Sequence, residues 1–154
     1  MSTRSSTHFT MGEKPRAIVY RHADGYPSGA GADLLEFLRA VQRQTPDTRF
    51  GDPSYLAAKY VVFLAERFAV DYEWTADEFK ITPRTNRLDF ISVGVCLSDP
   101  ADIEYRYIVD CTTRLDPEAG LPFGRPSIRV EHGYADTWAD LGEIRDVLAI
   151  GDPS

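Results

Sequence analysis

The chain has 154 residues, a formal net charge of −7 at pH 7, and 43% hydrophobic and 12% aromatic residues. This length suits one domain that buries about 68–70% of its unfolded surface, so folding requires neither disulfides nor a metal. The acidic balance argues against binding to nucleic acid or to an anionic membrane. No apolar run approaches the ~20 residues that span a bilayer, and two cysteines without an export signal indicate the cytoplasm. We expect a flexible segment at residues 1–6 followed by a single domain over 7–150.

The first predicted element is a β-hairpin. Polar and apolar residues alternate over 7–11, a turn follows at 12–15, and the segment RAIVYRH over 16–22 is rich in β-forming residues. A hairpin closed by this turn would place Phe9 opposite Ile18. Four side chains would then form the core face of the hairpin: Phe9, Met11, Ile18 and Tyr20.

Two helices are predicted next. Asp33 and Glu36 favour the positive end of a helix, and its apolar residues recur at helical spacing: Leu34, Phe37, Leu38 and Val41. Asp52 and Pro53 form an N-cap and a first-turn proline. The following stretch, 55–70, is apolar on most sides and predicts the most buried helix of the fold.

A second hairpin is predicted from strands at 90–97 and 103–109, which alternate around a turn at 98–102. This pairing would separate the sulfurs of Cys96 and Cys111 by roughly 20 Å, too far for a disulfide. Both thiols are therefore expected to be free.

The last predicted elements are a short strand at 127–132, after a loop at 115–126, and a helix. Four apolar residues define that helix by their spacing: Trp138, Leu141, Ile144 and Leu148. Three acidic residues would line one of its faces: Asp136, Asp140 and Glu143. No element is assigned to 75–88. The pattern predicts an α+β fold, with a mainly antiparallel sheet of about five strands and three helices mostly on one face.

The most distinctive segment is the turn Asp24–Gly31, DGYPSGAG, between a strand and a helix. Glycines permit positive φ and close approach, and a glycine-rich helix entry can aim N–H groups at a phosphate or carboxylate. We therefore expect a non-catalytic site for a small anion, such as a nucleotide-like one. Eight residues would form it: Tyr20, Arg21, His22, Asp24, Gly25, Tyr26, Gly29 and Gly31. The segment is neither a P-loop, because Ala32-Asp33 follows the last glycine, nor a dinucleotide fingerprint, because Leu34 replaces its third glycine.

The signature Tyr20-x-His22-x-Asp24-Gly25-Tyr26-Pro27, with the hairpin before it, resembles a family of small uncharacterised bacterial and phage proteins. The resemblance covers about the first quarter of the chain. It implies no established activity. Occurrence in phages and mobile elements implies an accessory role, such as host takeover or interference with defence. At position 23, where an aromatic residue often stands, this chain has alanine.

Other interpretations stay open. The glycines could serve only the geometry of the turn, or the acidic face of the last helix could bind a protein partner. His22 and Asp24, two positions apart, could act as an acid–base pair in an enzyme. No catalytic motif is present, and only His8 and His132 remain as further imidazoles, so neither a metal nor a cofactor is predicted. A homodimer is left open.

Overall fold

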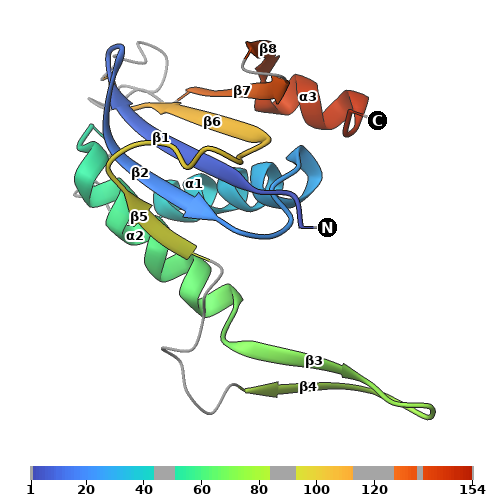
Figure 1. Cartoon of the computed structure of the whole chain (residues 1–154). Coiled ribbons are helices and arrows are strands. Elements are labelled where there is room, and N and C mark those ends of the chain that lie inside the picture. Colours follow the sequence, from blue (N-terminus) through green and yellow to red (C-terminus); the bar gives the residue numbers. More distant parts are fainter. Residues whose placement is uncertain (1, 44–50, 84–92, 113–126, 135–136, 154) are drawn as a thin grey trace.

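The computed structural model describes residues 2–43, 51–83, 93–112, 127–134 and 137–153. Within them a six-stranded sheet and three α-helices form an α+β fold, and a two-stranded hairpin projects from it (Figure 1). The strands are β1 (Ser5–Met11), β2 (Lys14–Arg21), β3 (Val70–Trp74), β4 (Phe79–Pro83), β5 (Val93–Cys96), β6 (Tyr105–Asp110), β7 (Ser127–Tyr134) and β8 (Thr137–Glu143). The helices are α1 (Ala32–Arg43), α2 (Pro53–Arg67) and α3 (Ile144–Ile150), and a π-helical turn, η1 (Pro27–Gly31), leads directly into α1.

The large sheet is mixed, with the strand order β5-β2-β1-β6-β7-β8. β1 and β6 are parallel, whereas the other neighbouring strands are antiparallel. The prediction of about five strands in an antiparallel sheet is therefore correct only in part. The predicted hairpin of 90–97 with 103–109 is wrong, because β5 pairs with β2 while β6 lies beyond β1. The chain between β5 and β6 must pass across two strands.

The first hairpin forms, but its register differs from the prediction. The turn contains only Gly12 and Glu13, and Gly12 has φ +67°, which suits the first central position of a type II′ turn. A bulge follows at Phe9, which lies opposite Ala17 rather than Ile18. A shift of one residue moves side chains to the other face of the sheet. Phe9 and Val19 consequently face the core, Ile18 and Tyr20 occupy the opposite face, and Met11 is exposed.

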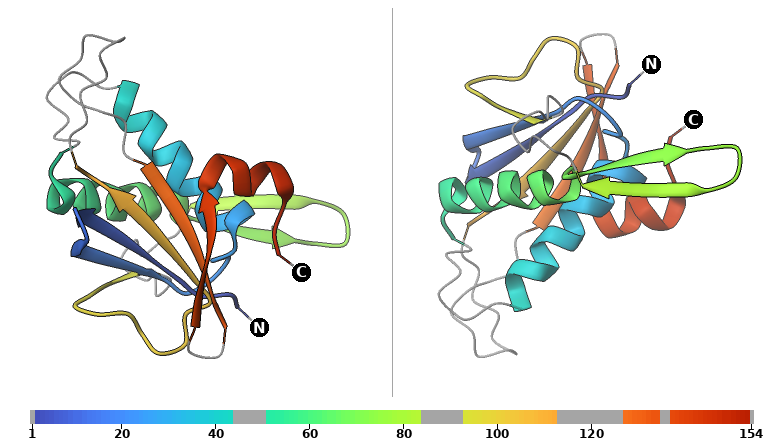
Figure 2. Two further views of the ribbon diagram at one scale, coloured as in Figure 1. Left: turned by 90° about the horizontal axis from the view of Figure 1, so that it is seen from above. Right: turned by 90° about the horizontal axis from the view of Figure 1, so that it is seen from below.

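The core lies between the sheet and the helices, which gather on one side of it (Figure 2). Side chains of all three helices join the core cluster, including Leu34 of α1, Leu64 of α2 and Ile144 of α3, each fully buried. The four apolar residues that predicted α1 are all buried, which confirms that helix: Leu34, Phe37, Leu38 and Val41.

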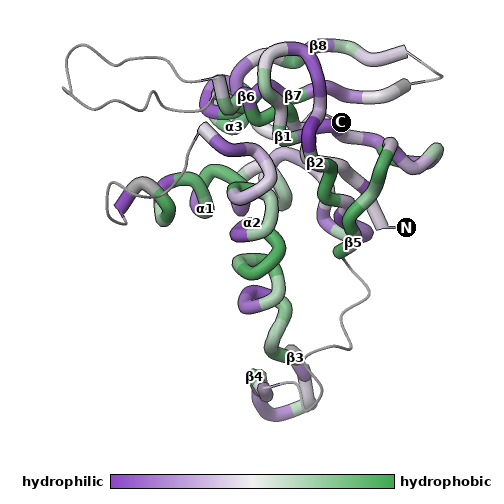
Figure 3. Tube along the Cα trace, turned by 90° about the vertical axis from the view of Figure 1, so that its left-hand side faces the viewer, coloured by the Kyte–Doolittle hydropathy of each residue, from purple (hydrophilic) through white to green (hydrophobic). Residues whose placement is uncertain are grey.

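α2 begins as predicted but is buried on one side only. The Asp52 carboxylate accepts hydrogen bonds from the backbone N–H groups of Ser54 and Tyr55, so Asp52 is the N-cap. Hydrophobic residues recur along α2 (Figure 3). Val62 is nevertheless 63% exposed, and only five of the fifteen residues of α2 are buried, so the prediction that it is the most buried helix of the fold is wrong.

The N-terminal segment is better ordered than expected. β1 begins at Ser5, and Ser5 and Ser6 are buried inside the segment 1–6 that was predicted to be flexible. The carbonyl of Arg4 accepts a hydrogen bond of 2.9 Å from the Glu104 N–H. Backbone hydrogen bonding therefore fixes this segment to the start of β6.

The predicted last helix is wrong in its first half. Trp138 and Leu141 lie on strand β8, and α3 begins only at Ile144, with Glu143 as its N-cap. Asp140 also lies on β8, while Asp136 lies outside the described residues. The acidic helix face proposed for protein binding therefore does not form.

The segment left unassigned, 75–88, contributes β4, and its residues 84–88 lie outside the described ones, as does the loop 115–126. β3 and β4 pair antiparallel, with Trp74 opposite Phe79, in a sheet of their own. This hairpin, residues 70–83, is called the arm below. It continues past the C-terminal end of α2, away from the sheet and the other helices (Figures 1 and 2).

Candidate functional site

The predicted anion-binding turn uses most of its N–H groups internally. The Gly25 N–H donates to the Thr3 carbonyl at 2.9 Å, and the Gly29 N–H to the Tyr26 carbonyl at 3.0 Å. The Ala30 N–H donates to the Asp24 carbonyl at 2.8 Å. Asp24 itself has φ +54°, a left-handed conformation that turns the chain sharply. These donors are not available to a ligand.

The glycines of this turn are explained by close packing. A Cβ at Gly25 would lie 2.8 Å from the carbonyl carbon of Arg4, and one at Gly31 would lie 2.7 Å from Cδ1 of Ile144. A Cβ at Gly29 would overlap the Asp24 carbonyl oxygen. The Gly25 carbonyl also accepts a hydrogen bond of 2.6 Å from the Tyr107 hydroxyl, on β6. Backbone atoms of the same molecule therefore account for Gly25 and Gly29, and a Cβ at Gly31 would require the Ile144 side chain to shift, so no ligand is needed to explain the glycines.

One donor pair of the turn does hold an anion, which belongs to the protein itself. Both the N–H and the hydroxyl of Ser28 donate to the carboxylate of Asp152, the N–H at 2.7 Å. Asp152 follows α3, 124 positions along the chain from Ser28. A carboxylate at the first turn of a helix is favourable, because the N–H groups there lack helical partners. The sequence did not identify either residue.

Arg21 is not available to bind a ligand. Its Nη1 donates to Asp33 Oδ2 at 2.6 Å, its Nε donates to the Ala23 carbonyl at 2.8 Å, and its guanidinium lies over the ring of Phe68. Only 5% of Arg21 is exposed. Asp33 also accepts from Arg67 at 2.8 Å. The cation predicted to line an anion pocket instead belongs to a buried ion pair that connects β2 with α1.

The remaining predicted site residues form two separate tyrosine pairs. The Tyr20 hydroxyl lies 2.8 Å from His22 Nδ1, and the Tyr26 hydroxyl donates to Asp24 Oδ1 at 3.2 Å. The negative charge of Asp24, with the hydrogen bond to it, raises the pKa of Tyr26. His22 and Asp24 thus bond to different tyrosines, so the described geometry does not join them as an acid–base pair.

A polar cluster that the sequence did not predict lies on the face of the sheet opposite the helices. Asp99, in the connection between β5 and β6, accepts hydrogen bonds from Ser6 at 2.6 Å and from Arg106 at 3.2 Å. Its Oδ1 is also 2.7 Å from His8 Nε2. Arg106 bridges to Glu131 of β7 at 2.8 Å. These bonds fasten the crossing segment to β1 and β6. Within the described residues, Arg106 Nε is buried without a hydrogen-bond partner.

The pKa of Asp99 reflects this cluster. Burial alone would raise the pKa of the carboxyl group. The hydrogen bonds from His8 and Ser6, the charge of His8 and the hydrogen bond from Arg106 outweigh burial and lower the pKa to about 2. The carboxylate is therefore ionised at neutral pH and stabilises the crossing segment.

The arm exposes large apolar side chains. Trp74 is 80% exposed and Ile81 is 57% exposed. The rings of Trp74 and Phe79 lie 4.5 Å apart between centroids, across the two strands. This surface was not predicted from the sequence, because the alternation in 70–83 is short and mixed with charged residues.

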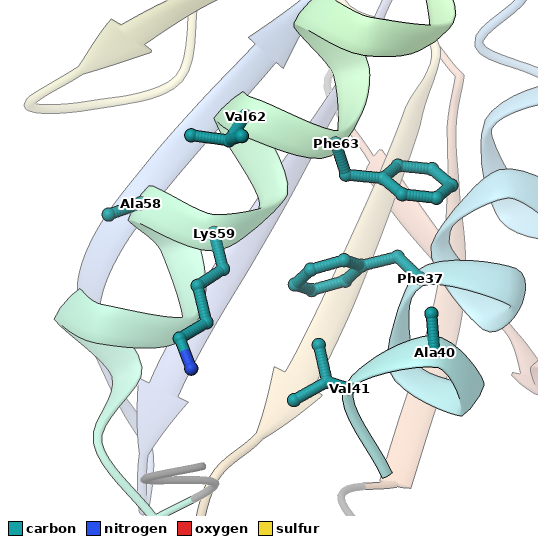
Figure 4. A pocket seen from close by; sticks show the side chains of 7 residues that line it. All are labelled: Phe37, Ala40, Val41, Ala58, Lys59, Val62 and Phe63. Atoms are coloured by element: carbon teal, nitrogen blue, oxygen red, sulfur yellow. The ribbon is translucent and has the colours of Figure 1, made fainter. Parts of the chain in front are cut away.

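A groove separates the outer sides of α1 and α2 (Figure 4). Its volume is about 420 Å³. It is lined by Phe37, Ala40 and Val41 of α1 and by Ala58, Lys59, Val62 and Phe63 of α2, and is called the α1–α2 groove below. Lys59 supplies its charged group, and the other side chains are apolar.

Two searches within the described residues and three comparisons were negative. No described helix combines the length and the apolar character needed to cross a bilayer. In the same residues, His, Cys, Asp and Glu side chains do not gather in threes that could hold a metal ion. The chain matches no family model, no curated protein and no solved structure.

Proposed function

We propose that this protein is a protein-binding module that engages its partner through the arm. The main observation is Trp74, a tryptophan with 80% of its surface exposed on a projecting hairpin. Tryptophan buries a large contact area at a small cost in conformational entropy, and it is enriched at the centres of protein interfaces. Ile81 adds a second exposed apolar side chain on the same hairpin.

The stability of the arm supports the same proposal. An isolated two-stranded hairpin is marginally stable in water and needs a third strand or a packed face. The arm pairs with neither edge of the large sheet. A partner that covers Trp74 would supply the packed face.

This proposal retains the hypothesis of a protein partner but assigns the contact to the arm instead of the acidic helix face. The predicted acidic helix face does not exist, whereas the arm combines apolar side chains with Glu73, Asp77 and Glu78. A protein-binding role also suits the accessory function that the sequence resemblance implies.

Site-specific photocrosslinking in the producing cells tests the arm. A photoreactive residue at position 81 should give a covalent adduct of defined mass. The same residue at position 95, where Val95 is 73% exposed on β5, is the control and should not. Trp74→Ser in the position-81 background should remove the adduct. Equal labelling from both positions, or labelling unaffected by Trp74→Ser, would refute the proposal.

A second candidate function is the capture of a small anion at Ser28. One observation favours it: the N–H and hydroxyl of Ser28 already hold the exposed carboxylate of Asp152. An external carboxylate or phosphate would have to displace Asp152. The glycines and Arg21 would not take part, because they are committed to packing and to Asp33.

A further inference from the structure

We infer that the partner of the arm is a second copy of this chain, and that Trp74 of each copy enters the α1–α2 groove of the other. The inference rests on the proposed function of the arm and names its partner. It accounts for two exposed apolar surfaces of one molecule by a single contact. The arm points away from its own helices, so it cannot cover the groove of its own chain (Figures 1 and 2).

The groove suits an indole ring in size and chemistry. Its volume of about 420 Å³ lies within the ~300–1,000 Å³ typical of pockets that bury most of a small ligand. Phe37 and Val41 are buried between the helices, whereas Val62 is exposed. Figure 4 shows the rings of Phe37 and Phe63 in the space between α1 and α2. Aromatic rings favour tilted or offset contacts with an inserted ring.

The charges of the two surfaces are complementary. Residues 70–83 contain four acidic side chains and one lysine, which gives a formal charge of −3. Lys59 lines the groove, and Arg39 and Arg43 lie beside it in a second depression that shares Ala40 with it. The one acidic residue lining that depression, Glu36, already pairs with Arg67 at 3.1 Å. Complementary charges of this kind set the register of an interface and favour encounter.

The reach of the arm fits a symmetric pair. Trp74 lies four residues beyond Val70, or about 13 Å along the strand. Lys59 and Phe63 lie one to two turns before the end of α2, or about 6–12 Å from Arg67. Two copies whose α2 helices meet end to end, in opposite directions, therefore place each Trp74 beside the groove of the other. A two-fold axis makes both contacts at once and closes the assembly.

Sedimentation of the full-length chain over a range of concentrations tests this inference. The wild type should dimerise as its concentration rises. Trp74→Ser and, in the groove, Val62→Glu should each raise the dimer dissociation constant by roughly tenfold or more. Val95→Ser, at an exposed apolar position outside both surfaces, should dimerise like the wild type. Because the arm contributes no described residue to the core cluster and Val62 is exposed, circular dichroism should show unchanged helix content in both variants.

Mixing the two defective variants gives the decisive result. Trp74→Ser keeps its groove and Val62→Glu keeps its arm, so the mixture can form one of the two contacts. A mixed dimer should form where neither variant dimerises alone, and weaker than the wild type. A wild type that stays monomeric, a dimer indifferent to Trp74→Ser, or a mixture without dimers would each overturn the inference. If crosslinking from position 81 then captures a different protein, the proposed function stands without the second copy.

Discussion

Arg21 Nη1 lies 2.6 Å from Asp33 Oδ2, and only 6% and 11% of the two side chains are exposed. Arg21→Ala would leave the carboxylate buried with one cation fewer, and breaking a buried pair in this way costs about 3–5 kcal/mol. Arg67→Ala removes the other, 41% exposed partner of Asp33 and should cost under ~1 kcal/mol. Urea unfolding of both variants measures the difference. Equal losses would show that the pair does not stabilise the junction of β2 with α1.

The Asp99 cluster should make the free energy of unfolding depend on pH in the acidic range. The pKa of Asp99 is about 2 in the folded protein and near 3.9 in an unfolded chain, so its contribution is complete above pH ~4–5 and disappears as the pH falls through about 2. Asp99→Asn should reduce the free energy of unfolding at pH 6 by about 2 kcal/mol, and the difference from wild type should shrink towards pH 2.

Asp77→Asn is the control for this titration, because Asp77 lies exposed on the arm. It should keep the wild-type dependence of unfolding on pH. A gap between Asp99→Asn and wild type that stays constant from pH 6 to pH 2 would contradict the prediction. It would mean that Asp99→Asn destabilises the protein through lost packing and not through the loss of the ionised carboxylate.

Gly29 should tolerate no side chain. A Cβ there would overlap the Asp24 carbonyl oxygen, a backbone atom that cannot rotate away, so Gly29→Ala should cost about 1–3 kcal/mol. Gly94 is the matched control, since a Cβ there meets Tyr20 at an ordinary 3.7 Å. Gly94→Ala should change the unfolding midpoint little. Similar midpoints for both variants would show that the turn can relax.

How much of this was predictable depends on the range of the interactions. α1 and the Asp52 cap follow from residues within one or two turns, and the sequence identified both. The register of β1 with β2 depends on a bulge at Phe9, and the start of α3 depends on the pairing of β8 with β7. Neither feature produces a recognisable pattern in the local sequence. Trp138, Leu141 and Ile144 recur at helical spacing, although the first two lie on β8. Periodicity alone could therefore not separate the strand from the helix.

The candidate site shows the same limit. The glycine-rich turn was identified, but its donors are bound by Thr3, Tyr26, Asp24 and Asp152, and the last of these is 124 positions from Ser28. Arg21 was expected to face a ligand because nothing nearby in the sequence announced its pairing with Asp33. The exposed surface of the arm was missed because solvent exposure depends on the tertiary fold and not on the local sequence.

The two cysteines should differ in reactivity. Both are free, as predicted, although the hairpin from which we argued this does not form. Cys111 is 2% exposed, and burial, with the charge of Asp110, raises the pKa of its thiol to about 12. Cys96 is partly exposed. Thiol titration at neutral pH should therefore find one fast group in the native protein and two in denaturant. Two fast groups in the native state would contradict the buried position of Cys111.

Replacing Asp152 should decide whether Ser28 can hold an external anion. In the wild type the Asp152 carboxylate competes at an effective concentration on the order of millimolar or higher, because it is attached to the same chain. Asp152→Ala frees the N–H and hydroxyl of Ser28. Titration with inorganic phosphate should then move the Ser28 amide resonance in a saturable way, and the wild type should respond far more weakly. Ser28→Ala in the Asp152→Ala background should weaken the response, because one of the two donors is lost. If the Ser28 resonance of Asp152→Ala does not respond to phosphate, the anion-binding candidate is wrong, and the contact serves only to hold the segment after α3 against η1.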